Sequence, residues 1–450
     1  MTSVPRPRRH PDAALTRAVA LVATPVLAGP TGGSRLVIQT TRLANGVHVV
    51  TEAIPGSHSV TTGFWVDAGS RDEGPTQIGA SHFLEHLLFK GTATRSAREI
   101  AESVEAVGGD MNAFTTKEYT AFYTRLIDTD LDLGLDILSD IMWAPALRPD
   151  EIEAERQVIL EEILMHEDEP SDLVHDLFAE TLYPDHPLGR EVLGDRSTIL
   201  AMTRDDIAGY FDALYRPEAI VVAAAGNVDH DRVVAGIESR LDGRTGSRPE
   251  RTRPQLSPAR PLAVSNRPTE QAHVVVGTRA LARDDDDRFA LNVINEVLGG
   301  GMSSRLFQEI REKRGLVYSV YSYRAAYVES GYLAVYAGTS PTSVHEVLDL
   351  VDVELDRLVD AEITDRELAI AKGHVKGSLA LSLEDSAGRM SRIGRSQLIH
   401  GYVPSFDELV ARTEAVTRAD LRRVVEKVVT GDRILAVVGP FTEDAFAAHA

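Results

Sequence analysis

The 450-residue sequence contains no cysteine. This absence excludes disulfide bonds, cysteine-ligated zinc and thiol nucleophiles. Any metal site in the chain must therefore be built from His, Asp and Glu. The lack of cysteine gives no firm indication of the cellular compartment.

Long apolar runs and basic residues are also scarce. No run reaches the roughly 18–20 residues that a transmembrane helix requires, so we expect no membrane span. The chain has 47 Lys and Arg against 68 Asp and Glu, which gives a net charge of −21. Contacts to phosphates require Lys and Arg, so we expect no nucleic-acid partner. The acidic surplus favours solubility, with attraction of basic peptides as the alternative.

The N-terminal stretch differs in character from the rest. Three arginines precede an apolar run at residues 18–28, which loosely resembles a signal peptide. Pro25 interrupts that run, so we predict a disordered extension over residues 1–35 and keep an export signal as the alternative. The high ratio of Arg to Lys is typical of GC-rich bacterial genomes, and we expect a cytoplasmic bacterial protein.

A stretch rich in Pro, Arg and Ser divides the chain at residues 244–262 and has almost nothing to bury, which predicts a linker. The two flanking parts show a similar order of expected elements. Each ends with a helix, a buried strand and a glycine, at residues 204–226 and 418–439. We therefore predict an α+β fold of two homologous α/β sandwich units, each an antiparallel-rich sheet with helices packed on it. The units cover residues 36–243 and 263–446.

Residues 80–89 (ASHFLEHLLF) predict a short helix that is apolar nearly all round and therefore buried. His82, Glu85 and His86 share its remaining sector. Burying a carboxylate with two imidazoles is costly unless a partner satisfies them, and a divalent metal would do so. Histidines at positions i and i+4 can both bind one ion. The alternative is a helix end with satisfied core histidines.

A catalytic zinc usually has three protein ligands and a water molecule. In the helix expected over residues 151–166, a helical wheel places Val158, Ile159, Ile163 and Met165 on the apolar arc. Glu162 falls near the middle of that arc, with Glu155 about 20° away. A buried acid needs a partner, so we expect Glu162 as the third ligand and Glu155 as a supporting group. A solvent-exposed acidic helix is the alternative.

The segment His82 to His86 resembles the inverted zinc motif, His-x-x-Glu-His, of the pitrilysin-type or M16 metallopeptidases. It is particularly similar to that of mitochondrial processing peptidase beta subunits and their bacterial relatives. That family has a glutamate about 75 residues after the second histidine, and 75 residues lie between His86 and Glu162. A helper glutamate seven residues earlier falls on Glu155. Glu85 would then be the general base toward a zinc-bound water.

Two further segments resemble the same family. Residues 108–115 are similar to its substrate-binding edge strand, to which a peptide adds as a β-strand, and this implies that Asn112, Ala113 and Phe114 contact substrate. In the second half, Arg311 and Tyr318 match a pair seven residues apart that reaches across to the active site. The second half has no His-x-x-Glu-His motif, as in the inactive repeat of this family.

The resemblance implies a zinc metalloendopeptidase with a LuxS/MPP-like fold, one zinc ion per chain and peptide substrates. Members of the family form a chamber from four α/β units, and this chain has two. We therefore expect a homodimer, or a heterodimer with a homologue that lacks the motif. One alternative is a non-catalytic subunit of an M16-type assembly, although the intact zinc set argues against it. Another is a peptide-binding or clearance protein with weak hydrolysis.

Overall fold

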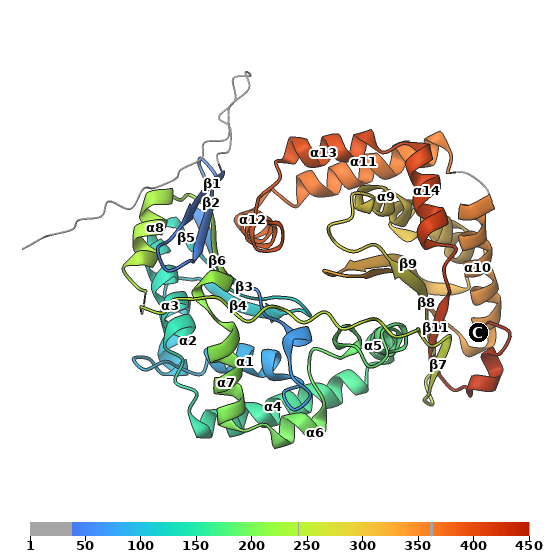
Figure 1. Cartoon of the computed structure of the whole chain (residues 1–450). Helices are drawn as coiled ribbons and strands as arrows, with labels where there is room; N and C mark the ends of the chain where they lie inside the picture. The colour runs from blue at the N-terminus through green and yellow to red at the C-terminus, as the bar shows by residue number, and fades with distance from the viewer. Residues whose placement is uncertain (1–37, 242, 361–362, 450) are drawn as a thin grey trace, which may run out of the picture.

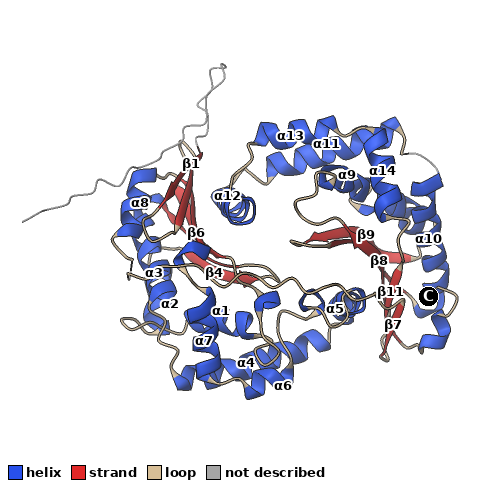
Figure 2. Cartoon of the chain, in the orientation of Figure 1, coloured by secondary structure: helices blue, strands red, loops and turns tan. Residues whose placement is uncertain are grey.

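The computed structural model describes residues 38–241, 243–360 and 363–449. Two halves each contain one sheet with helices packed on it, which confirms the predicted fold class (Figures 1 and 2). The predicted extension at residues 1–35 lies outside the described residues. None of the helices in the described part of the chain is long and apolar enough to cross a membrane.

The first half is built on a six-stranded sheet in the order β1-β2-β6-β3-β5-β4. Only β2 and β6 pair in parallel, and β4 forms one edge. The free edge of β4 is the feature of this sheet that matters most for the site described below. The strands are β1 (Ile38–Arg42), β2 (His48–Ala53), β3 (Ser59–Val66), β4 (Asp110–Thr115), β5 (Thr120–Ile127) and β6 (Ile220–Gly226).

Most helices of the first half cover the same face of this sheet and enclose its main apolar core (Figure 1). The exception is α5, which extends toward the second half. The helices are α1 (Ala80–Leu88), α2 (Ala97–Glu105), α3 (Leu131–Trp143), α4 (Pro149–Glu167), α5 (Pro170–Leu182), α6 (Arg196–Ala201), α7 (Arg204–Leu214) and α8 (His230–Glu238).

The second half repeats the sheet of the first without a counterpart of β1. Its order is β7-β11-β8-β10-β9, again with one parallel pair, β7 and β11, and with β9 at an edge. The strands are β7 (Leu262–Asn266), β8 (Ala272–Ala280), β9 (Val317–Ala326), β10 (Gly331–Thr339) and β11 (Ile434–Gly439). The helices are α9 (Arg288–Gly299), α10 (Val344–Asp360), α11 (Asp365–Leu381), α12 (Ser386–His400), α13 (Phe406–Ala415) and α14 (Arg418–Val428).

The two halves exchange one helix each. Helix α12 of the second half lies on β2, β3 and β6 of the first sheet, where Met390 and Ile393 join the apolar cluster around Trp65. Its Arg389 also donates to the buried Glu52 of β2, at 2.6 Å. Helix α5 of the first half packs in turn on β7, β8 and β11 of the second sheet, with Phe178 fully buried there. Each half therefore completes a core of the other.

Residues 244–261 connect the halves without regular secondary structure and run from the first half across to β7 (Figure 1). The predicted linker covers residues 244–262, and Leu262 is the first residue of β7. Two of its arginines, Arg248 and Arg251, both bind Asp72 of the first half. The linker is therefore fastened to the first half along its course.

Close packing between α12 and the first sheet yields a stability test. A Cβ atom at Gly394 would lie 2.2 Å from Trp65 Nε1, so Gly394→Ala must displace the helix or the indole. We expect a destabilisation of roughly 1–3 kcal/mol, seen as a lower Tm in thermal unfolding. Gly377→Ala is the matched control, since a Cβ there in α11 meets no atom within 4 Å. Equal changes in Tm would contradict the packing described for α12.

Candidate functional site

Helix α1 carries the first part of the site. Its apolar side chains are buried as predicted, with Phe83, Leu84 and Leu88 fully inaccessible, and it packs against α4 and α7. His82 and His86 lie one turn apart on the remaining face, and their Nε2 atoms approach to 3.2 Å. Burial and the neighbouring His86 lower the pKa of His82 to about 4, so the ring is neutral at pH 7. Both rings thus lie close enough to share one ion.

Helix α4 brings a carboxylate to the two imidazoles. Glu162 Oε2 lies 3.5 Å from His86 Nε2 and 3.7 Å from His82 Nε2. This oxygen is buried, and no residue of the described chain donates a hydrogen bond to it; His82 Nδ1 is likewise buried without a partner there. A proton shared between the two rings would still leave the Glu162 oxygen unsatisfied. One ligand atom from each of the three residues lies within 4.8 Å of the others, which fits a metal ion.

The predicted orientation of α4 is wrong in one respect. Val158 and Met165 were expected on its buried face, yet they are 42% and 71% exposed. Ile159 and Ile163, expected on the same arc, are buried and pack into the first core together with Leu160. Glu162 therefore lies at the margin of the buried face, with its side chain 37% exposed. That position lets the carboxylate reach the histidines while remaining accessible from outside.

Glu155 holds His86 in place from two turns earlier on α4 than Glu162. It is 5% exposed, and its Oε2 lies 3.0 Å from His86 Nδ1. A proton on Nδ1 donated to this carboxylate leaves the lone pair of Nε2 directed at the shared position. Lys90 Nζ lies 2.7 Å from the other oxygen of Glu155. Lys90 was missed in the sequence, because it lies in the turn after α1 ends at Leu88 and its contact with Glu155 depends on how α4 packs there.

Glu85 lies between the metal-binding group and the edge strand. Its Oε2 accepts a 2.6 Å hydrogen bond from Thr115 Oγ1 at the end of β4. Burial raises the pKa of this carboxyl above its usual range. Thr115 was not singled out in the sequence, because its contact with Glu85 depends on the packing of β4 against α1. The pair fixes where the carboxylate lies relative to the free edge of β4.

The residues expected to bind substrate lie on that edge. Asn112 is exposed, and its Oδ1 accepts the backbone N–H of Ala113 at 2.8 Å, so this N–H is directed away from β5. Phe114 points to the sheet face covered by α12, where it packs edge-to-face on Trp65 with ring centroids 5.6 Å apart. Asn112 and Ala113 therefore offer polar groups at the edge, whereas Phe114 contributes to the packing between the halves.

Arg311 and Tyr318 lie together in the second half. The Arg311 guanidinium is 5.4 Å from the centre of the Tyr318 ring, and Tyr318 is 80% exposed at the start of β9. In the described part of the chain, the ring contacts of Arg311 are with Tyr318 and with Phe307 of the same segment. The structure thus brings His82, His86, Glu85, Glu155 and Glu162 together and places the Arg311–Tyr318 pair apart from them.

A second group with metal-binding side chains lies further along α4. His166, Asp176 and Glu191 also place one donor atom each within 4.8 Å of the others. His166 Nε2 and Asp176 Oδ2 are already in hydrogen-bond contact. Burial raises the pKa of Asp176, but the hydrogen bonds with His166 and Glu191 and the nearby charges of His166 and Lys117 lower it overall, and the ammonium group of Lys117 would repel a cation. These contacts favour the first group as the metal centre.

Comparisons with known proteins identify the family of this chain. Residues 48–196 match the model of insulinase, peptidase family M16, and residues 201–374 match the peptidase M16 inactive domain. An uncharacterized zinc protease of Streptomyces coelicolor is 46% identical over 415 residues, which cover 90% of either chain. One from Bacillus subtilis is 38% identical over 88% of this chain and 97% of its own length. The chain belongs to peptidase family M16, as its motifs suggested.

Solved structures show the same fold. A protease from Helicobacter pylori superposes with a TM-score of 0.84 at 23% identity, over 90% of this chain and all of that chain. A peptidase M16 inactive domain from Pseudomonas fluorescens gives a TM-score of 0.83 at 21% identity, over 90% of this chain and 98% of its own. Both likenesses concern the fold alone.

Metal titration separates the two groups of donors. We expect the metal-free chain to bind one zinc ion, and His82→Ala and Glu162→Ala to abolish tight binding because each removes one of three ligands. His166→Ala is the matched control, since it removes a donor from the second group on the same helix. Isothermal titration with zinc measures each affinity. If zinc binding survived in His82→Ala and disappeared in His166→Ala, the metal would belong to the second group.

Proposed function

We propose that this protein is a zinc-dependent endopeptidase that cleaves extended peptides or unfolded segments. The observation that carries the proposal is the buried oxygen of Glu162, which faces the Nε2 atoms of His82 and His86 without any donor among the described residues. His, His and Glu are a common ligand set for catalytic zinc. A fourth side chain, the carboxylate of Glu85, lies beside this group and is held toward a free strand edge.

Each side chain then has a defined role. A zinc ion bound by His82, His86 and Glu162 would supply Lewis acidity and lower the pKa of a bound water. Glu85 accepts a proton from the water that attacks the scissile carbonyl carbon and delivers it to the departing amine. Glu155 keeps the His86 ring oriented through Nδ1, in the way that outer carboxylates usually support histidine ligands.

The peptide lies along the free edge of β4. Addition of a strand to an exposed sheet edge supplies backbone hydrogen bonds that do not depend on the substrate sequence. The outward N–H of Ala113 is one such donor, and the side chain of Asn112 must release it when a peptide carbonyl takes its place. Arg311 and Tyr318 hold the peptide or the developing oxyanion from the second half, as the family resemblance implies.

A non-catalytic role within an M16-type assembly is the second candidate. A subunit that only binds peptides requires the edge of β4 but does not require the buried metal-binding side chains. The complete set of His82, Glu85, His86, Glu155 and Glu162 therefore favours the enzyme. Absence of cleavage by the zinc-loaded protein across a broad peptide library would favour the binding role instead.

Glu85 can be tested without disturbing the ligands. Glu85→Gln keeps the size and the hydrogen bond from Thr115 but cannot accept a proton. We expect zinc binding to persist and kcat on an unstructured peptide to fall by roughly 10²–10⁴. Glu161→Gln, an exposed change on α4, is the control and should leave turnover unchanged. Full activity in Glu85→Gln would overturn the assignment of the base, and a chelator should stop cleavage by the unmodified enzyme.

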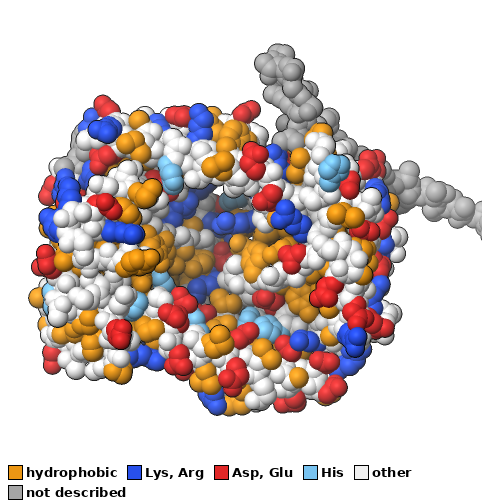
Figure 3. All heavy atoms as spheres, turned by 180° about the vertical axis from the view of Figure 1, so that it is seen from behind, with side chains coloured by type: hydrophobic (Ala, Val, Ile, Leu, Met, Phe, Trp, Pro, Cys, Tyr) orange, Lys and Arg blue, Asp and Glu red, His pale blue; other side chains and the backbone are white. Residues whose placement is uncertain are grey.

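We also propose that two chains act together. One face of the molecule is hollowed at its centre, where hydrophobic and basic side chains border the opening (Figure 3). A second chain, identical or homologous, would close this hollow into the four-unit chamber expected from the family resemblance. Sedimentation velocity of the pure protein should show a species of about twice the chain mass of 49.0 kDa. A monomer at micromolar concentration would argue against the homodimer.

A further inference from the structure

Three consecutive residues between β3 and α1 connect the metal-binding helix to the rest of the molecule. We propose that Arg71, Asp72 and Glu73 act together as positioning residues that hold the second half and the linker at a fixed place relative to α1. The proposal rests on the peptidase function proposed above, because it concerns how the parts of that site are brought into register. None of the three touches the candidate ligands, and each binds a different part of the structure.

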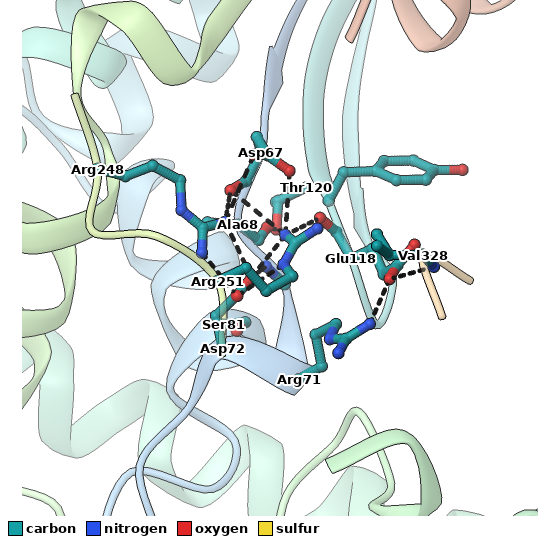
Figure 4. A network of polar contacts seen from close by, with 12 residues as sticks. Asp67, Ala68, Arg71, Asp72, Ser81, Glu118, Thr120, Arg248, Arg251 and Val328 are labelled. Atoms are coloured by element: carbon teal, nitrogen blue, oxygen red, sulfur yellow. Dashed lines mark hydrogen bonds and ion pairs between the residues drawn. The ribbon is translucent and has the colours of Figure 1, made fainter. Parts of the chain in front are cut away.

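Arg71 connects the first half to the second. Its side chain is 2% exposed, and its guanidinium donates to Glu118 Oε1 at 2.5 Å and to both carboxylate oxygens of Glu329, which precedes β10. Glu118 in turn accepts from Arg283 Nη1 at 3.0 Å and from the N–H of Val328 at 3.1 Å (Figure 4). A series of alternating charges therefore crosses between the halves, with two residues from each half. Because buried charges must be paired, this series is stable in only one relative orientation of its residues.

Asp72 fastens the linker. Its side chain is 4% exposed and accepts two hydrogen bonds of 2.8 Å from Arg251 and another of 2.8 Å from Arg248 (Figure 4). Arg251 Nη2 also donates to the backbone oxygen of Glu118 at 2.7 Å. Bidentate pairs between arginine and carboxylate fix direction as well as distance. The chain leading into the second half is thus held against the residue that follows Arg71.

Glu73 holds the start of α1. Its Oε2 accepts the N–H of Gly79 and its Oε1 accepts the N–H of Ser81, both at 2.8 Å. The first N–H groups of a helix have no partner within the helix, so this side chain satisfies donors that would otherwise be buried and unpaired. His82 is the next residue. A change in this attachment therefore shifts His82 and Glu85 directly.

The same segment also contacts the turn that ends the substrate edge. The backbone N–H groups of Ser70 and Arg71 donate to the carbonyl oxygens of Thr116 and Lys117, at 3.1 and 2.9 Å. That turn joins β4 to β5. The short segment around Arg71 thus meets the metal-binding helix, the edge strand, the linker and the half that carries Arg311 and Tyr318. The geometry of this segment therefore sets the distance between the metal-binding helix and the second half, and a peptide must bind between these two parts.

The role of Arg71 is tested by Glu329→Gln, which removes its charged partner in the second half and leaves α1 untouched. A smaller population of the binding-competent orientation weakens apparent substrate binding in proportion. We expect KM for an unstructured peptide to rise about tenfold with kcat nearly unchanged. The radius of gyration from solution X-ray scattering of the zinc-loaded protein should increase, and zinc affinity should stay the same.

The matched control is Glu367→Gln, which breaks an ion pair of Arg305 entirely within the second half. It should change neither KM nor the radius of gyration. Identical behaviour of Glu329→Gln and Glu367→Gln in both measurements would overturn the proposal. If the unmodified zinc-loaded protein cleaved no peptide, the proposed function would fail, and scattering of the same two variants would still decide the positioning role.

The role of Glu73 is tested by Glu73→Gln, because the amide nitrogen of glutamine cannot accept a hydrogen bond from one of the two N–H groups. We expect zinc affinity and kcat to fall about tenfold, a size typical of residues that orient metal ligands. The radius of gyration should remain that of the unmodified protein, because the contacts between the halves persist. Unchanged zinc affinity in this variant would refute the role of Glu73, whatever the outcome for Glu329→Gln.

Discussion

A buried carboxylate oxygen to which no described residue donates a hydrogen bond is the constraint around which this structure is arranged. Glu162 Oε2 lies within 4 Å of two imidazole nitrogens, and a bound cation would satisfy all three atoms together. The apolar character of α1 follows from this, because the helix must be enclosed on every side except the one that carries His82, Glu85 and His86. Polar contacts continue away from the site, from His86 to Glu155 and from Glu155 to Lys90.

The parts of the fold that could be predicted are those whose signals are local. Helix α1 was predicted from residues 80–89, because helical periodicity can be recognised within a single segment of sequence. His82 and His86 were recognisable from their spacing, and Glu162 from an acid near an apolar face and from the family spacing. The wheel for α4 failed at Val158 and Met165, since both apolar side chains face outward beside Glu162.

The features that could not be predicted depend on distant partners. The apolar residues of α12 pack against Trp65 in the other half, so the sequence of α12 alone does not indicate which surface the helix covers. Arg71, Asp72 and Glu73 look like any charged loop until Glu329, Arg251 and the start of α1 are brought beside them. Residues that fix how two segments lie relative to each other are hard to recognise from the sequence of either segment alone.

The exchange of α5 and α12 has a consequence for how the molecule can be divided. A cut in the linker would separate the polypeptide at the boundary that composition suggests, but each fragment would then take away a helix that the other needs. The first sheet would lose the cover over Trp65, and the second would lose the cover supplied by Phe178. The two halves are thus interlocked, so that duplication has produced a single cooperative body with two sheets.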